Sequence, residues 1–148
     1  KEIKPGTGRK LKDGEGVAIL SFGHPGNFAA AAIRELRAEE LNPAHYDMRF
    51  AKPLDENLLH EVFRKFNKII TVEDGTVQGG FGSAVLEFMA LHQYGAQVKI
   101  LGIPDLVIEQ GTPKELQKEC GYDVAAIAAA VRKMMNEEQH AAIHKSIL

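Results

Sequence analysis

Hydrophobic residues along this chain gather in short continuous runs, separated by longer stretches in which they recur every three or four positions. Continuous apolar runs are typical of strands covered on both faces of a sheet, and they occur at 17–22 and 69–72. Residues 98–103 are predicted to form a further strand. Residues 45–50 alternate between apolar and polar side chains, which predicts another strand, and 9–12 predicts a short one. These segments are the expected strands of one sheet.

Helices are expected between these strands. Asn27, Asp55 and Asp123 each precede a helical pattern and are predicted to cap it, and Gly95 is predicted to end the third helix. Strands separated by helices of this length favour an α/β fold with a mainly parallel sheet and helices on both faces. The expected helices cover about 28–40, a segment opened by Pro53 and Asp55 that runs to Phe66, 80–94, 112–120 and 124–135.

The pattern predicts one domain with a segment of different character at each end. Residues 1–16 are rich in Lys, Gly and Pro, and we interpret them as a linker with a possible edge strand, closed by a turn at Asp13-Gly14. Residues 17–135 form the expected domain, and the polar residues 136–148 form a tail that could be a frayed helix. The first residue is Lys1 rather than Met, so we expect a piece of a longer protein.

Composition narrows the range of partners. The 148 residues carry a net charge of -2, so there is no basic surface excess of the kind that binds nucleic acid or anionic membranes. Cys120 is the single cysteine, which excludes an intrachain disulfide and favours a reducing, cytoplasmic location. No apolar run approaches the roughly 18 residues that span a bilayer.

The segment 69–91 organises the chain. Its strand leads through a polar turn to Gly79, Gly80 and Gly82 and then into a helix. Glycines at a helix start allow close approach of either an anion to the free amide groups or a neighbouring strand or domain. Val85 breaks the dinucleotide-binding pattern and no P-loop lysine follows, so close packing is favoured while anion binding stays open.

Other candidate chemistry has a structural explanation in each case. Glu73 and Asp74 could form an acid–base pair, but adjacent carboxylates at a strand end are more typical of turn and cap residues. His24 is expected in a loop without a nucleophile motif. His140 and His144 lie four apart, the spacing of two metal ligands on one helix face, but no H-E-x-x-H pattern surrounds them. We expect no metal site.

Three separated motifs carry a family resemblance. HYDMRFAKPLDENLL (45–59), IITVEDGTVQGGFGSAV (69–85) and ILGIPD followed by EQGTPKEL (100–116) occur in this order. They resemble the C-terminal domain of transketolase-type thiamine diphosphate enzymes, and most narrowly the 1-deoxy-D-xylulose-5-phosphate synthases, over about residues 16–135. Gln110 stands where many relatives have histidine, and Leu106 stands where a charged or aromatic residue is common.

The resemblance implies a three-layer α/β/α fold with a five-stranded, mostly parallel mixed sheet, in which 9–12 is the candidate antiparallel strand. It also implies that the parent enzyme uses thiamine diphosphate and Mg²⁺ to join pyruvate and glyceraldehyde 3-phosphate with loss of CO₂, for isoprenoid and thiamine biosynthesis. Those cofactors are held by a Gly-Asp-Gly motif and a glutamate in other domains. This chain has no Gly-Asp-Gly, so we expect no catalytic, cofactor-binding or metal-binding residue in it.

The implied role is a structural and interaction domain that packs on other domains of the same chain and on a second subunit of a homodimer. Val77 and Phe81 are expected to add exposed apolar area to this interface. A stand-alone small-ligand or anion-binding domain is the alternative. The candidate interface and packing residues are Glu73, Asp74, Gly75, Val77, Gly79, Gly80, Phe81 and Gly82.

Overall fold

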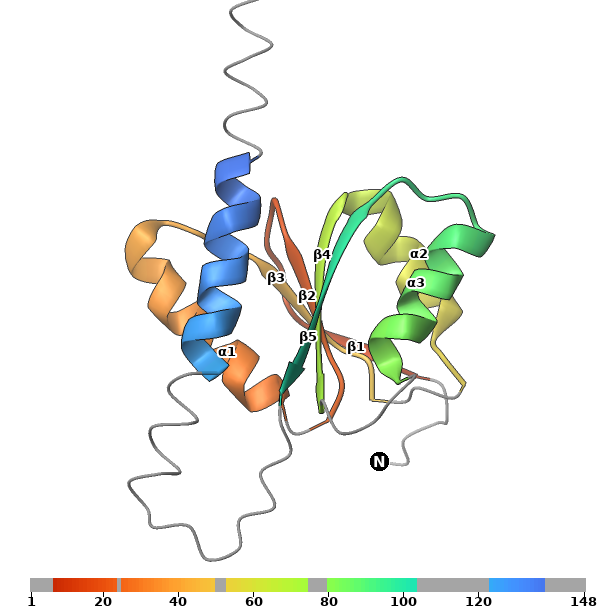
Figure 1. The fold of residues 1–148 in the computed structure, drawn as a ribbon, viewed down its shortest axis with the longest axis horizontal. Coiled ribbons are helices and arrows are strands. Elements are labelled where there is room, and N and C mark those ends of the chain that lie inside the picture. Colours follow the sequence, from red (N-terminus) through yellow and green to blue (C-terminus); the bar gives the residue numbers. More distant parts are fainter. Residues whose placement is uncertain (1–6, 24, 50–52, 75–79, 104–122, 138–148) are drawn as a thin grey trace, which may run out of the picture.

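A computed structural model describes residues 7–23, 25–49, 53–74, 80–103 and 123–137. These residues form a five-stranded sheet with helices on both faces, which confirms the predicted α/β/α architecture (Figure 1). The strand order is β1-β3-β2-β4-β5. The strands are β1 (Arg9–Lys12), β2 (Ala18–Ser21), β3 (Ala44–Asp47), β4 (Lys68–Asp74) and β5 (Gln97–Ile103).

The strand directions agree with those that the family resemblance implies. β1 pairs antiparallel with β3, whereas β2–β3, β2–β4 and β4–β5 are parallel pairs. The strand at 9–12 is therefore the antiparallel edge strand that was expected. From the central strand β2 the chain adds β3 on one side and then β4 and β5 on the other, so the strand order reverses between β2 and β4. In open parallel sheets the loops at the carboxyl ends of such a pair are the usual place for a functional site.

The helices form two layers. α1 (Gly26–Leu36), which continues as the 3₁₀ turn η1 (Arg37–Glu39), lies with the helix at 123–137 on one face, while α2 (Glu56–Lys65) and α3 (Phe81–Leu91) cover the other. Alternate side chains of each central strand enter the two cores: in β4, Ile70 packs with the first layer and Ile69 with the second. Covering both faces explains why the central strands read as continuous apolar runs.

The expected caps have mixed outcomes. Asp55 does cap α2: one carboxylate oxygen accepts from the Leu58 amide at 3.0 Å and the other accepts from the Gly8 amide at 2.9 Å. The prediction for Asn27 is wrong, because α1 begins at Gly26 and its preceding residue, Pro25, makes no side-chain cap bond. The Pro25 carbonyl instead accepts from the amides of the first turn.

Two helices end before their expected last residue. α1 gives way to η1 at Arg37, and Glu40 then takes a left-handed backbone conformation with φ of 60°. The prediction that Gly95 ends α3 is wrong, because the helix stops at Leu91 and Gln93 supplies the positive φ of 59°. Gly95 lies in the loop before β5, where an added Cβ would meet nothing within 4 Å.

The segment between β1 and β2 lies close against the sheet. An added Cβ on Gly14 would come within 2.3 Å of the Ala44 nitrogen, and the Glu15 amide donates to the Asn42 carbonyl at 2.8 Å. Gly14 is therefore needed for backbone approach.

Several predictions fall outside the described residues. They concern the helix at 112–120 and the tail at 138–148, with Cys120, His24, Leu106, Gln110, His140 and His144. In the part of the chain that the structure describes, no helix is long and apolar enough to cross a membrane.

Candidate interaction site at the start of helix α3

Glu73 joins the end of β4 to the beginning of α3. Its carboxylate accepts hydrogen bonds from the amides of Phe81 at 2.7 Å and Gly82 at 2.8 Å, and the residue is only 7% exposed. These are two of the four amides that a helix start leaves without a helical partner, and the negative charge lies at the positive end of the helix dipole. Glu73 therefore caps α3 from the neighbouring strand, and this contact uses both of its carboxylate oxygens.

Gly82 makes this contact possible. An added Cβ at this position would lie 2.8 Å from both Glu73 Oε1 and Ile100 Cγ2, closer than real Cβ contacts come. Only glycine therefore lets the first turn of α3 approach both the Glu73 carboxylate and the β5 side chain. Gly80 immediately precedes α3 with a negative φ of -82°, so its backbone does not require a left-handed conformation.

Phe81 is buried, contrary to the expectation that it adds exposed apolar surface. It is 0% exposed, and its ring stacks on Phe22 with centroids 5.7 Å apart. Phe22 follows β2, and its amide donates to the Val72 carbonyl on β4. Phe81 thus packs α3 against the place where β2 and β4 lie side by side and the strand order reverses. Its aromatic side chain belongs to the domain's own core and is not available to a partner.

The remaining members of the candidate set are Asp74, Gly75, Val77 and Gly79. Asp74 is the last residue of β4, where its backbone pairs with Ile103 of β5. Gly75, Val77 and Gly79 lie outside the described residues. The structure thus brings Glu73, Phe81 and Gly82 together as one packed joint, with Gly80 at its margin.

The joint also bears on the anion-binding alternative. An anion on the first amides of α3 would have to displace the Glu73 carboxylate, which already uses the Phe81 and Gly82 amides. Bringing a second negative charge to the same place is unfavourable because like charges repel in a poorly hydrated site. The geometry therefore favours close packing over an anion cradle.

A buried polar pair at the ends of β2 and β3 was not predicted. Ser21 Oγ lies 2.8 Å from His45 Nε2, and both residues are buried. Burial lowers the pKa of His45, while Asp47 acts in the opposite direction. Ser21 could have been noticed only as the polar residue within an apolar run. Because neither group reaches solvent, we interpret the pair as a hydrogen bond across two strands rather than as a nucleophile and its base.

A second unpredicted cluster surrounds His60 on the outer side of α2 and α3. His60 Nδ1 is hydrogen bonded to the Tyr94 hydroxyl, and its ring centroid lies 4.5 Å from that of His92. Partial burial, and then the neighbouring His92, lower the pKa of His60.

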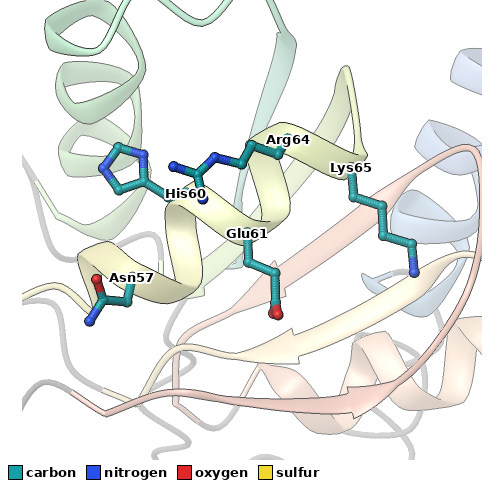
Figure 2. Close-up of a pocket in the computed structure, with 5 residues that line it drawn as sticks. All are labelled: Asn57, His60, Glu61, Arg64 and Lys65. Atoms are coloured by element: carbon teal, nitrogen blue, oxygen red, sulfur yellow. The ribbon is translucent and has the colours of Figure 1, made fainter.

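Figure 2 shows the open depression beside this cluster, where the side chains diverge from α2 instead of pointing to a common centre. It mixes one carboxylate with basic groups, so no ligand of one charge is favoured. The lining residues are Asn57, His60, Glu61, Arg64 and Lys65. Within the described ranges, no group of three or more His, Cys, Asp or Glu side chains could hold a metal ion.

Comparison with known proteins finds one family model and several similar enzymes. The model of the family described as "Transketolase, C-terminal domain" matches residues 6–127. The 1-deoxy-D-xylulose-5-phosphate synthase of Cytophaga hutchinsonii is 62% identical over 133 residues, which are 90% of this chain and 21% of that protein. The synthase of Bacteroides thetaiotaomicron is 53% identical over 89% of this chain and 21% of its own length. The chain thus spans about a fifth of the length of these curated relatives.

A solved structure described as "Split gene transketolase, inactive beta4 tetramer" has the same fold. It superposes with a TM-score of 0.76 at 34% sequence identity, over 92% of this chain and 44% of that one.

Proposed function

Because the chain belongs to the transketolase C-terminal domain family, we propose that it is a non-catalytic structural and interaction domain of a thiamine diphosphate-dependent 1-deoxy-D-xylulose-5-phosphate synthase. The parent enzyme would be a cytoplasmic homodimer that condenses pyruvate with glyceraldehyde 3-phosphate and releases CO₂, for isoprenoid and thiamine biosynthesis. This domain would pack on the other domains of its chain and on the second subunit.

The observation that carries the proposal is the 62% identity to a synthase over 90% of this chain. The oligomeric description of the structural relative, a beta4 tetramer, supports an associating role for the fold. The packed joint at Glu73 supports a structural role, because its polar groups are used internally.

The residues present do not fit the cofactors of the proposed parent. The sequence contains no Gly-Asp-Gly, and the described part offers no cluster of metal-ligating side chains. We therefore assign no step of the reaction to this chain. Thiamine diphosphate and Mg²⁺ would be held by other domains of the parent.

A domain exchange tests the proposal directly. In the synthase of Cytophaga hutchinsonii, the matching 133 residues are replaced by those of this chain. If the domain is structural, the chimera should retain the relative's kcat and its KM for both substrates, whereas deleting the segment should abolish soluble, active enzyme. A chimera that folds and binds thiamine diphosphate but has lost kcat would contradict the proposal, because it would place a catalytic contribution in the exchanged segment.

The isolated chain gives an independent readout. Calorimetric titration with thiamine diphosphate and Mg²⁺ should show no binding, and micromolar affinity would overturn the non-catalytic assignment. The same titration with inorganic phosphate addresses the alternative of a stand-alone anion-binding domain. We expect no binding of phosphate, because the Glu73 carboxylate occupies the amides of the α3 start.

A further inference from the structure

The two edges of the sheet are built differently. β1 has four residues, three of them basic, and its pairing with β3 shifts register between Lys10 and Lys12. Short length, lysine side chains and a bulge are the features by which proteins prevent an edge strand from pairing with another chain. β1 therefore has the first two features, and its irregular register acts in the same direction as a bulge.

β5 has few of the features that prevent an edge strand from pairing. It runs for seven residues, it contains no proline, and Lys99 is its one charged residue. Its pairing with β4 is regular over the whole length, so no bulge interrupts it. The outer edge has no partner strand among the described residues. A long, regular and largely uncharged edge strand presents backbone N–H and C=O groups that can extend the sheet.

Ile100 lies at the centre of this strand. It is 37% exposed, and its side chain also contacts the start of α3, because its Cγ2 atom is one of the two nearest obstacles to a Cβ on Gly82. Ile100 is thus a β-branched residue that is partly packed against its own domain and partly exposed at a sheet edge. Such a side chain is well suited to a cross-strand pair.

We infer that β5 pairs antiparallel with β5 of a second copy of this chain, about a two-fold axis at Ile100, to give one continuous ten-stranded sheet. A two-fold contact uses the same surface on both copies and closes after two, so it forms a dimer and not a filament. The inference goes beyond the proposed function, because it identifies an interface and does not depend on which enzyme contains the domain.

The sequence of β5 is compatible with this register. Centring the pair on Ile100 uses all seven residues and places Lys99 opposite Leu101 of the partner subunit, so that the two lysines do not face each other. Centring it on Lys99 would oppose two lysines, which is unfavourable. Centring it on Leu101 would shorten the overlap to the residues from Lys99 to Ile103.

The first test compares the two edges. Ile100→Lys adds a charge at the proposed axis, and Leu11→Lys makes the same type of change on β1, where Leu11 is 45% exposed. By analytical ultracentrifugation over a range of concentrations, the wild-type chain should dimerise. Ile100→Lys should weaken dimerisation about tenfold or more, equivalent to about 1.4 kcal/mol, and Leu11→Lys should leave it unchanged. Melting temperatures identify any variant that fails to fold.

A cross-linking test examines the register and does not depend on a destabilising change. In a Cys120→Ser background, Ile100→Cys would place two thiols directly opposite each other. Opposed Cβ atoms lie about 4.5–5.5 Å apart, within a small adjustment of disulfide geometry. Lys99→Cys is the matched control, because its counterpart would be Leu101 of the partner subunit. Mild oxidation should cross-link the Ile100→Cys chain and not the Lys99→Cys chain.

Three outcomes would overturn the inference. They are a wild-type chain that stays monomeric at millimolar concentration, a dimer that survives Ile100→Lys but not Leu11→Lys, and equal cross-linking through positions 99 and 100. None of these results affects the domain-exchange experiment, so failure of the interface and failure of the proposed function are distinguishable.

Discussion

Replacing Glu73 by glutamine tests whether the joint between β4 and α3 is a main source of stability. The change keeps the shape of the side chain but removes its charge and one of its two acceptor oxygens. The Phe81 and Gly82 amides both donate to that carboxylate now, at 2.7 and 2.8 Å. Glutamine can accept from one of them, and its NH₂ group then faces the other donor.

The expected loss follows from these contacts. A hydrogen bond to a charged group contributes about 1.5–3 kcal/mol, and a buried donor left without an acceptor costs about 1–3 kcal/mol. Since Glu73 is 7% exposed, water can replace the lost acceptor only in part. We therefore expect the free energy of unfolding to fall by about 3 kcal/mol. In a domain of this size, such a loss lowers the melting temperature by about 6–12 °C.

Urea unfolding followed by circular dichroism measures this change. Glu87→Gln is the control, because Glu87 lies on the same helix and is exposed. Surface substitutions of this kind usually alter stability by no more than about 0.5 kcal/mol. Equal stability of the two variants would refute the argument, since it would mean that the carboxylate contributes nothing beyond an ordinary surface charge.

Three further predictions concern the same domain. Gly82→Ala should cost about 1–3 kcal/mol through overpacking, whereas Gly95→Ala, with open space around its Cβ, should be neutral in the same urea titration. Phe81→Ala should cost about 3–5 kcal/mol, and Leu91→Ala, at a position 75% exposed, should change the melting temperature little. Burial lowers the pKa of His45 below its usual 6.5, so the unfolded chain binds a proton that the folded chain excludes. Stability is therefore full above about pH 6.5 and falls as the pH drops below it, and His45→Gln should flatten this dependence in unfolding titrations at pH 5.5 and 7.5.

The sheet could be predicted from the sequence because burial on both faces has a direct signature. The run at 17–22 contains β2, and the run at 69–72 lies within β4, so only the ends of these central strands differ from the prediction. Asp55 was identified as a cap because its partner, the Leu58 amide, is three residues away. Local contacts of this kind leave a recognisable spacing in the sequence.

Contacts between distant segments leave no such spacing. The Ser21–His45 pair joins two strands 24 residues apart, and only the register of the sheet brings the two side chains together. Asn27 was expected to cap α1 because of its residue type, but Pro25, with its own φ of -57°, is already suited to begin the helix two residues earlier. Similarly, Gln93 took the left-handed position that a glycine was expected to fill.

The burial of Phe81 changes where an interface can be. Both faces of the sheet are covered by helices, so association through the described residues has to use helix surfaces or sheet edges. Leu11, Leu91 and Ile100 are the large hydrophobic side chains exposed there. Leu91 is a single residue at the end of a helix, and scattered surface leucines are common in monomeric proteins. Leu11 lies between two lysines on a strand that is already protected. Ile100 differs from both, because it lies on the long, regular strand β5, whose outer edge has no partner strand among the described residues. Association at that edge would therefore gain main-chain hydrogen bonds over seven residues as well as apolar contact, whereas Leu91 lies on a helix and Leu11 on a four-residue strand with an irregular register.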